Sequence, residues 1–84
     1  MANWNEMLRE VFAKRGDYFA QMVCTVSVEQ LNAEFDNGYG SEEGCAFTAW
    51  GENYVYFPIC YDGSEWVGSA PRNPCDESLG HQGG

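Results

Sequence analysis

Cys45–Ser69, CAFTAWGENYVYFPICYDGSEWVGS, combines sheet-forming residues with turn signals. Its aromatic and β-branched side chains are typical of a pleated, half-buried surface. Gly51-Glu52-Asn53 suits a short hairpin loop, and Asp62-Gly63 is the dipeptide that a type I′ turn favours. The stretch therefore predicts an antiparallel β-meander of three strands over residues 45–69.

The lengths of the two loops predict which residues face each other across the strands. With two residues in the second loop, the cross-strand pairs are Ile59 with Trp66 and Phe57 with Gly68. With three residues in the first loop, the pairs are Phe47 with Phe57 and Trp50 with Tyr54. Pro58 removes a donor from the ladder, so we expect a bulge there or a ladder that breaks on one side.

This register gives the sheet one dry face and one mixed face. The dry face, expected to form the core around Phe57, carries Phe47, Ala49, Val55, Phe57, Ile59 and Trp66. The mixed face carries Thr48, Trp50, Tyr54, Tyr56, Cys60 and Val67. Large aromatic side chains together with hydroxyl groups suit a partly wet surface or an interface.

Two helices are expected before the sheet, within residues 3–36. Asn3–Arg15 has apolar residues at three- and four-residue steps, and Gly16 ends the helix. Ser27–Phe35 begins with a capping box formed by Ser27 and Gln30. Residues 17–26 fit a strand or a helix, and we favour a helical or irregular segment. The expected fold is α+β, with the N-terminal helices packed on one face of the meander in a single domain, 1–84.

Residues 37–44 read as an acidic, glycine-rich loop, and residues 70–84 as an extended tail that contains Pro71 and Pro74. The loop lacks the Lys and the following helix of a phosphate-binding loop. Calcium is a weaker alternative, because the spacing of the acids in this loop does not match an EF-hand. We therefore expect no cofactor and no metal site.

The charge of the chain is strongly acidic. Thirteen Asp and Glu against four Lys and Arg give a formal net charge of −9, and no base lies between Gly16 and Pro71. Such a surface favours solubility and attracts basic proteins, whereas direct binding of DNA or RNA calls for Lys and Arg. The N-terminus has no secretory pattern and the chain has no membrane-length apolar run, so we expect a cytoplasmic protein with no membrane contact.

No catalytic constellation accompanies the predicted sheet. The four cysteines, at positions 24, 45, 60 and 75, include no C-x-x-C pair, so we expect reduced and mostly buried thiols. Zinc would depend on Cys75 and His81, the one close combination. His81 is the only histidine and lies in the tail, so we expect no catalytic residues and a protein that is not an enzyme.

The base-free span from Gly16 to Pro71, with its acid pairs Glu34/Asp36 and Glu42/Glu43, resembles a class of small inhibitors encoded by phages and mobile elements. These are the anti-CRISPR and anti-restriction proteins, and the resemblance is one of class, without a shared motif. It implies a protein that occupies the basic nucleic-acid path of a nuclease complex in the host cytoplasm, presenting carboxylates where phosphates would lie.

We therefore expect an acidic inhibitor that binds a basic nucleic-acid-binding protein or nuclease complex. Aromatic anchors supply affinity in such an interface, and acids supply steering. The expected partner-binding residues are Glu34, Asp36, Glu42, Glu43, Trp50, Glu52, Tyr54, Tyr56 and Glu65. The alternative is a small structural or regulatory module without catalytic activity that forms a homodimer through the aromatic face of its sheet.

Overall fold

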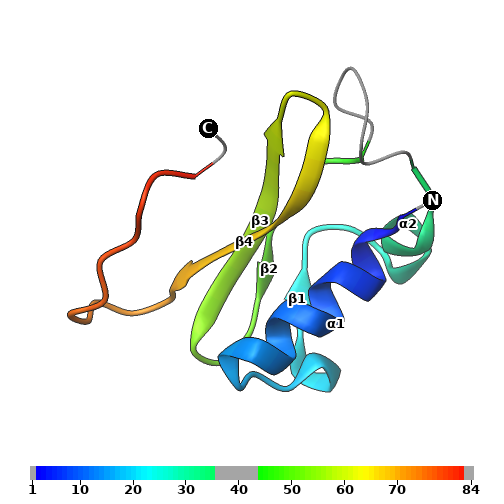
Figure 1. Cartoon of the computed structure of the whole chain (residues 1–84). Coiled ribbons are helices and arrows are strands. Elements are labelled where there is room, and N and C mark those ends of the chain that lie inside the picture. The colour runs from blue at the N-terminus through cyan, green and yellow to red at the C-terminus, as the bar shows by residue number, and fades with distance from the viewer. Residues whose placement is uncertain (1, 36–43, 83–84) are drawn as a thin grey trace.

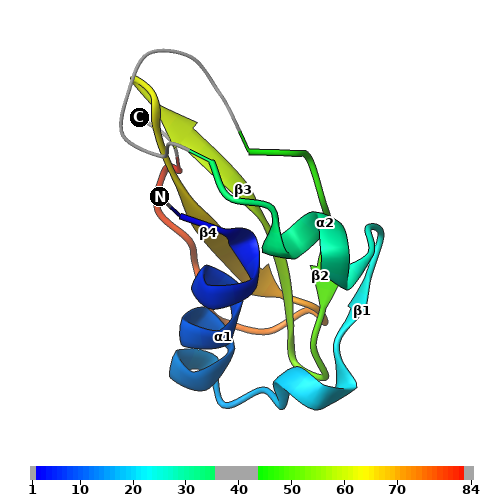
Figure 2. The ribbon, with the colours of Figure 1, turned by 90° about the vertical axis from the view of Figure 1, so that its right-hand side faces the viewer.

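The structure, a computed structural model, describes residues 2–35 and 44–82. Two helices, α1 (Trp4–Arg15) and α2 (Val28–Asn32), lie on one side of a four-stranded antiparallel sheet (Figures 1 and 2). The strands are β1 (Val23–Cys24), β2 (Ala49–Trp50), β3 (Tyr54–Tyr61) and β4 (Ser64–Pro71), in the order β1-β2-β3-β4. The expected α+β fold is confirmed, and the sheet has four strands where three were expected.

Local sequence explains the bounds of α1. The Asn3 side chain accepts a hydrogen bond from the Glu6 amide at the first turn. Gly16 ends the helix in the left-handed conformation, with φ of 77°, which glycine adopts without steric cost. Between these caps, Trp4, Leu8 and Phe12 form one buried stripe that faces the sheet.

Residues 17–26, whose sequence fits both a helix and a strand, contain a short 3₁₀ turn and a short strand. A 3₁₀ turn at Phe19–Gln21 agrees with the favoured helical or irregular segment, but β1 follows it and pairs with β2. Cys24 packs against the core while Val23 is exposed, which is the alternation of a strand. The capping box at Ser27 is confirmed, although α2 ends at Asn32, and Phe35 pairs with Ala2 instead of extending the helix.

The hairpin of β3 and β4 has the predicted register. Ile59 lies opposite Trp66 and Phe57 opposite Gly68, and the loop residues Asp62 and Gly63 have φ of 51° and 82°. Both positive values are those of a type I′ turn, in which strand pairing alternates outward from a hydrogen-bonded closing pair. Pro58 therefore lies in a pair that is not hydrogen-bonded, and its backbone nitrogen points away from β4.

Pro58 also marks where the ladder on the other side of β3 stops. The pairing of β2 with β3 covers Ala49 with Tyr56 and Trp50 with Val55, so it ends before Pro58 is reached. Of the two expectations, a bulge or a ladder that breaks on one side, the second is confirmed. The missing donor of proline costs nothing there because no strand residue faces it.

The predicted register of the first hairpin is wrong by one residue. Trp50 pairs with Val55, not with Tyr54, and the Gly51 amide donates to the Tyr54 carbonyl at 2.9 Å. Glu52 and Asn53 are thus the only residues in the loop. Since side chains alternate along a strand, a slip of one residue exchanges the two faces of β3 relative to β2.

In β3 and β4 the core consequently forms on the face that was expected to be mixed, whereas Phe47 and Ala49 are buried in the core as expected. Tyr56 is fully buried there, whereas Phe57 lies on the opposite face, away from the helices. Aromatic rings dominate the core: the Phe12 ring stacks on Tyr56 with centroids 4.1 Å apart, and Trp4 contacts both Phe35 and Phe47. The buried residues of the core cluster are Trp4, Leu8, Phe12, Leu31, Phe35, Phe47, Ala49, Tyr56 and Val67.

Truncation of one phenylalanine on each side of the sheet tests this arrangement. Phe12→Ala should lower the free energy of unfolding by about 3–5 kcal/mol, because it leaves a cavity in the core. Phe57→Ala should cost about 1 kcal/mol, the typical value for a single substitution, because its ring is partly exposed. Denaturant titration measures both values. A larger loss for Phe57→Ala than for Phe12→Ala would contradict the observed register.

Candidate functional site

A buried carboxylate positions the turn between β2 and β3. The chain leaves α1 through Gly16 and places Asp17, which is 7% exposed, beneath that turn. Its carboxylate accepts hydrogen bonds from the Tyr56 hydroxyl (2.6 Å), the Tyr54 amide (3.2 Å) and both the backbone and side-chain amides of Asn53 (3.1 Å each). A Cβ at Gly51 would overlap the carboxylate, so this close approach requires glycine.

The surroundings of Asp17 shift the pKa values of both partners away from neutrality. Burial raises the pKa of Asp17, but the hydrogen bonds from Tyr56, Asn53 and Tyr54 together lower it below its ordinary value. Burial, followed by the hydrogen bond to the Asp17 carboxylate, raises the pKa of Tyr56 well above its ordinary value. Near neutral pH, Asp17 therefore stays ionised and Tyr56 stays protonated. Their hydrogen bond holds Tyr56 in the core.

With Tyr56 turned inward, the residues on the other side of the sheet are mostly apolar. We name this side the apolar face. Strand pairing places ten residues on it: Val23, Trp50, Val55, Phe57, Ile59, Tyr61, Ser64, Trp66, Gly68 and Ala70. No residue of this set carries a charge, although the chain has a net charge of −9. An antiparallel sheet that is solvated on one side normally has polar residues there.

Side chains on the apolar face pack on one another and still leave large groups exposed. A Cβ at Gly68 would lie 2.7 Å from the Phe57 ring, so glycine lets Phe57 and Ile59 close over the strand. The exposed fractions of Val23, Tyr61 and Trp66 are 64%, 56% and 40%. Such a patch on a small protein is typical of a binding surface.

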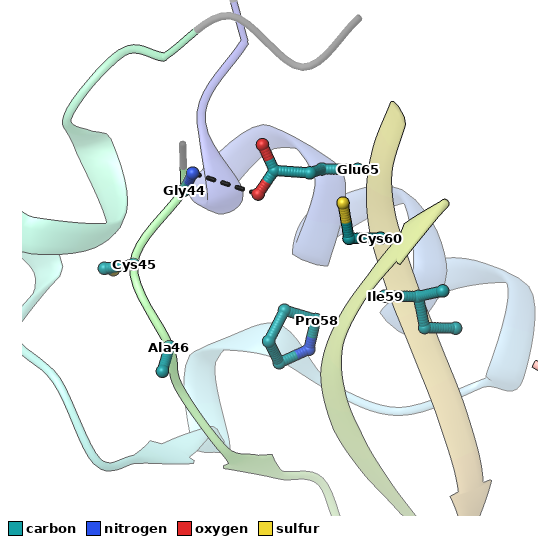
Figure 3. Close-up of a pocket in the computed structure, with 7 residues that line it drawn as sticks. All are labelled: Gly44, Cys45, Ala46, Pro58, Ile59, Cys60 and Glu65. Carbon is teal, nitrogen blue, oxygen red and sulfur yellow. Dashed lines mark hydrogen bonds between the residues drawn. The ribbon is translucent and has the colours of Figure 1, made fainter. Parts of the chain in front are cut away.

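A second buried acid ties the chain segment before β2 to the hairpin. Glu65 of β4 accepts a hydrogen bond from the Gly44 amide at 2.9 Å, and Figure 3 shows it at the rim of a small pocket beside Cys60. The indole of Trp4 donates to the Cys45 carbonyl at 2.9 Å and holds the same segment from the helix side. Glu65 is buried and so acts in the fold, which corrects its expected place on a binding surface.

The structure does not gather the expected partner-binding residues into one surface. Glu34 and Glu52 are exposed, whereas Asp36, Glu42 and Glu43 lie outside the described residues. Trp50 is half-buried on the apolar face. Tyr54 is also half-buried, and Arg15 lies over its ring.

The expectation that Tyr56 anchors a partner is wrong, because its ring is buried and its hydroxyl binds Asp17. The exposed apolar side chains that sequence reasoning did not single out are Val23, Tyr61 and Trp66. Tyr61 and Trp66 follow from the alternation along β3 and β4 once the register is known. Val23 gave no such signal, because a strand of two residues leaves no periodic pattern.

The cysteines are less buried than expected. All four are free thiols; Cys45 and Cys75 are exposed, and Cys24 and Cys60 are partly buried. Within residues 2–35 and 44–82, no three His, Cys, Asp or Glu side chains are grouped so that they could hold a metal ion. No helix in this part of the chain is long and apolar enough to cross a membrane.

Substitution of Asp17 tests whether its carboxylate holds the turn. Asp17→Asn should lower the free energy of unfolding by about 2–3 kcal/mol at pH 7, because an amide cannot accept from all these donors. The folded pKa of Asp17 is lowered, so its ionisation stabilises the fold above the ordinary pKa of 3.8 and stops doing so as the pH falls through the folded value. The difference between wild type and variant should therefore shrink below about pH 4 in denaturant titrations.

Tyr56→Phe serves as the matched control, since it keeps the buried ring and removes the hydroxyl. It should cost about 1.5–3 kcal/mol, the range for a hydrogen bond to a charged group. A difference between wild type and Asp17→Asn that stayed constant from pH 7 to pH 2 would contradict this role of the carboxylate.

Comparison of the chain with protein-family models, with curated proteins and with solved structures finds no match. The apolar face, with exposed aromatic and aliphatic side chains and no charge, is the candidate site that the geometry supports best.

Proposed function

We propose that this protein is an acidic protein-binding module whose apolar face anchors on a basic partner. The observation that carries the proposal is the apolar face itself, ten sheet positions without a charge in a chain of net charge −9. Large aromatic side chains at the centre of an interface contribute most of the binding energy in protein complexes. Trp66 and Tyr61 are large, exposed aromatic side chains of this face, with Tyr61 near its Asp62 end.

The distribution of charge supports a basic partner. The two loops that bound β3 carry the exposed acids Glu52 and Asp62, one near each end of the apolar face. Three of the four bases, Arg9, Lys14 and Arg15, belong to α1 on the other side of the sheet. An apolar centre with acidic ends steers a basic surface toward it and disfavours an acidic one.

We further propose that the partner is a nucleic-acid-binding protein or nuclease complex and that binding blocks its basic nucleic-acid path. The net charge and the span without bases support this step, because both match the class of small acidic inhibitors. In this form of the proposal the anchors are Trp66, Tyr61 and Trp50. Tyr56 and Glu65 are no longer included, since both are buried.

A second function, self-association through the apolar face, is favoured by one observation. The face has no charge of its own, so two copies could pack there without placing like charges in direct contact. Against this, each copy carries a net charge of −9, which opposes association at low salt.

Loss of the anchors tests the proposed interface. The tagged protein is incubated with nuclease-treated bacterial lysate, eluted with a salt gradient, and the eluted proteins are identified by mass. A nucleic-acid-binding protein retained by wild type is then titrated against Trp66→Ala and Tyr61→Ala, each of which should weaken binding at least about 30-fold, the effect of a central anchor. Val28→Ala is the control, because Val28 is equally exposed but lies on α2. Equal binding by all four proteins would refute the interface.

Charge reversal tests the acidic ends of the face separately. Replacing Glu52 and Asp62 with Lys should weaken binding of the same partner and reduce its dependence on salt, because fewer favourable charge pairs remain to be screened. Glu10→Lys, an exposed change on α1, should have a much smaller effect. An unchanged salt dependence in the double variant would refute the steering role of these acids.

Light scattering separates the two functions. The proposed binder should be a monomer at micromolar concentration, with or without Trp66→Ala. A wild-type dimer that Trp66→Ala converts to a monomer would favour self-association and refute the assignment of this face to a different partner.

A further inference from the structure

Beyond Arg72, the carboxylate of Glu77 attaches the C-terminal tail to the domain. Residues 72–82 are all exposed, and Figure 1 shows the tail running beside the β3–β4 hairpin. Arg72 continues the strand, donating its amide to Asn53 and its side chain to the Gly51 carbonyl. Past that point, the contact with the domain is made by Glu77.

Both oxygens of the Glu77 carboxylate are bound. One accepts a hydrogen bond from the Tyr54 hydroxyl at 2.8 Å, and the other lies 3.4 Å from a terminal nitrogen of Arg15. The hydrogen bond to Glu77 is the main reason that the pKa of Tyr54 is raised. Recognition of one carboxylate by a guanidinium and a hydroxyl is a charge-assisted arrangement with defined geometry.

Arg15 is held in place by groups outside the tail. Its Nε donates to the Ser69 hydroxyl at 2.9 Å, and its guanidinium lies 4.4 Å from the centroid of the Tyr54 ring. Both contacts come from the sheet, so the cation is oriented before a carboxylate arrives. An oriented Arg loses less conformational entropy on binding an anion than a free one does.

We propose that Arg15, Tyr54 and Ser69 form a carboxylate-binding site for an extended acidic peptide, which the chain's own Glu77 fills. The site is separate from the apolar face, since Tyr54 projects to the helix side of β3, so this inference is independent of the function proposed above. Arg15 thus binds an anion in a chain that is acidic overall.

The bound tail is exchangeable. The side chains of Arg15 and Glu77 are 31% and 32% exposed, and ion pairs of this kind are weak and screened by salt. Glu77 holds its position through the high effective concentration that a short tether provides, on the order of millimolar. A second peptide carboxylate at comparable concentration competes for the same two donors.

The test uses the full-length, ¹⁵N-labelled protein in reducing buffer and a synthetic peptide of residues 72–82. In Glu77→Ala the site is vacant, so the peptide should shift the Arg15 Nε–Hε and Tyr54 amide resonances in a saturable way, with Kd on the order of millimolar. Wild type should bind the peptide about twofold more weakly, because Glu77 competes from within the chain at an effective concentration close to that Kd. Asp76→Ala, which removes the neighbouring acid, should behave as wild type.

One further peptide and one further protein variant define the contacts. A peptide with Gln in place of its Glu should bind Glu77→Ala at least about tenfold more weakly, and so should the original peptide against Glu77→Ala that also carries Arg15→Gln. Equal affinities for wild type and Glu77→Ala, or no saturable shift in Glu77→Ala at tens of millimolar peptide, would overturn the proposal. Unaltered binding after Arg15→Gln would overturn it as well.

Discussion

The hydrogen bond of 2.6 Å from the Tyr56 hydroxyl to the Asp17 carboxylate joins the strand β3 to the chain that leaves α1, on the side of the sheet that the helices cover. It holds Tyr56 in the core, where the ring stacks on Phe12 of α1. Because side chains alternate along β3, Phe57 and its neighbours must then point away from the helices. The same carboxylate binds the amides of the β2–β3 turn and so sets the length of that loop. With Tyr56 buried in this way, the apolar face lies on the side of the sheet away from the helices.

The elements that the sequence predicts correctly are those whose conformation is determined by residues close together in the chain. The Asp62-Gly63 turn determines the register of β3 and β4 because positive φ at both positions is a local requirement. Gly51-Glu52-Asn53 is compatible with loops of two or three residues, and a carboxylate distant in sequence makes the choice. Tyr56 and Glu65 are polar and were expected at the surface, yet each is buried against a partner that no local pattern reveals. Three of the expected acids, Asp36, Glu42 and Glu43, lie outside the described residues.

The described part of the chain separates two kinds of surface. On one side, α1 carries most of the bases, and Arg15 uses its charge to bind a carboxylate within the chain. On the other side, the apolar face has no charge and is bounded by loops that contain Glu52 and Asp62. In the proposed complex, a basic partner would interact with the acidic ends while an apolar patch on it covers Trp66 and Tyr61. This division of roles is typical of interfaces in which aromatic anchors supply affinity and charges supply selectivity.

The central claim, that the sheet buries Tyr56 and exposes the opposite face, is tested most directly by solvent paramagnetic relaxation in NMR. A soluble paramagnetic agent should broaden the side-chain resonances of Trp66 and Tyr61, which are 40% and 56% exposed. The resonances of Trp4 and Tyr56 should be protected, because both side chains are buried in the core. Broadening of Tyr56 together with protection of Trp66 would place the helices on the other face of the sheet and contradict the account.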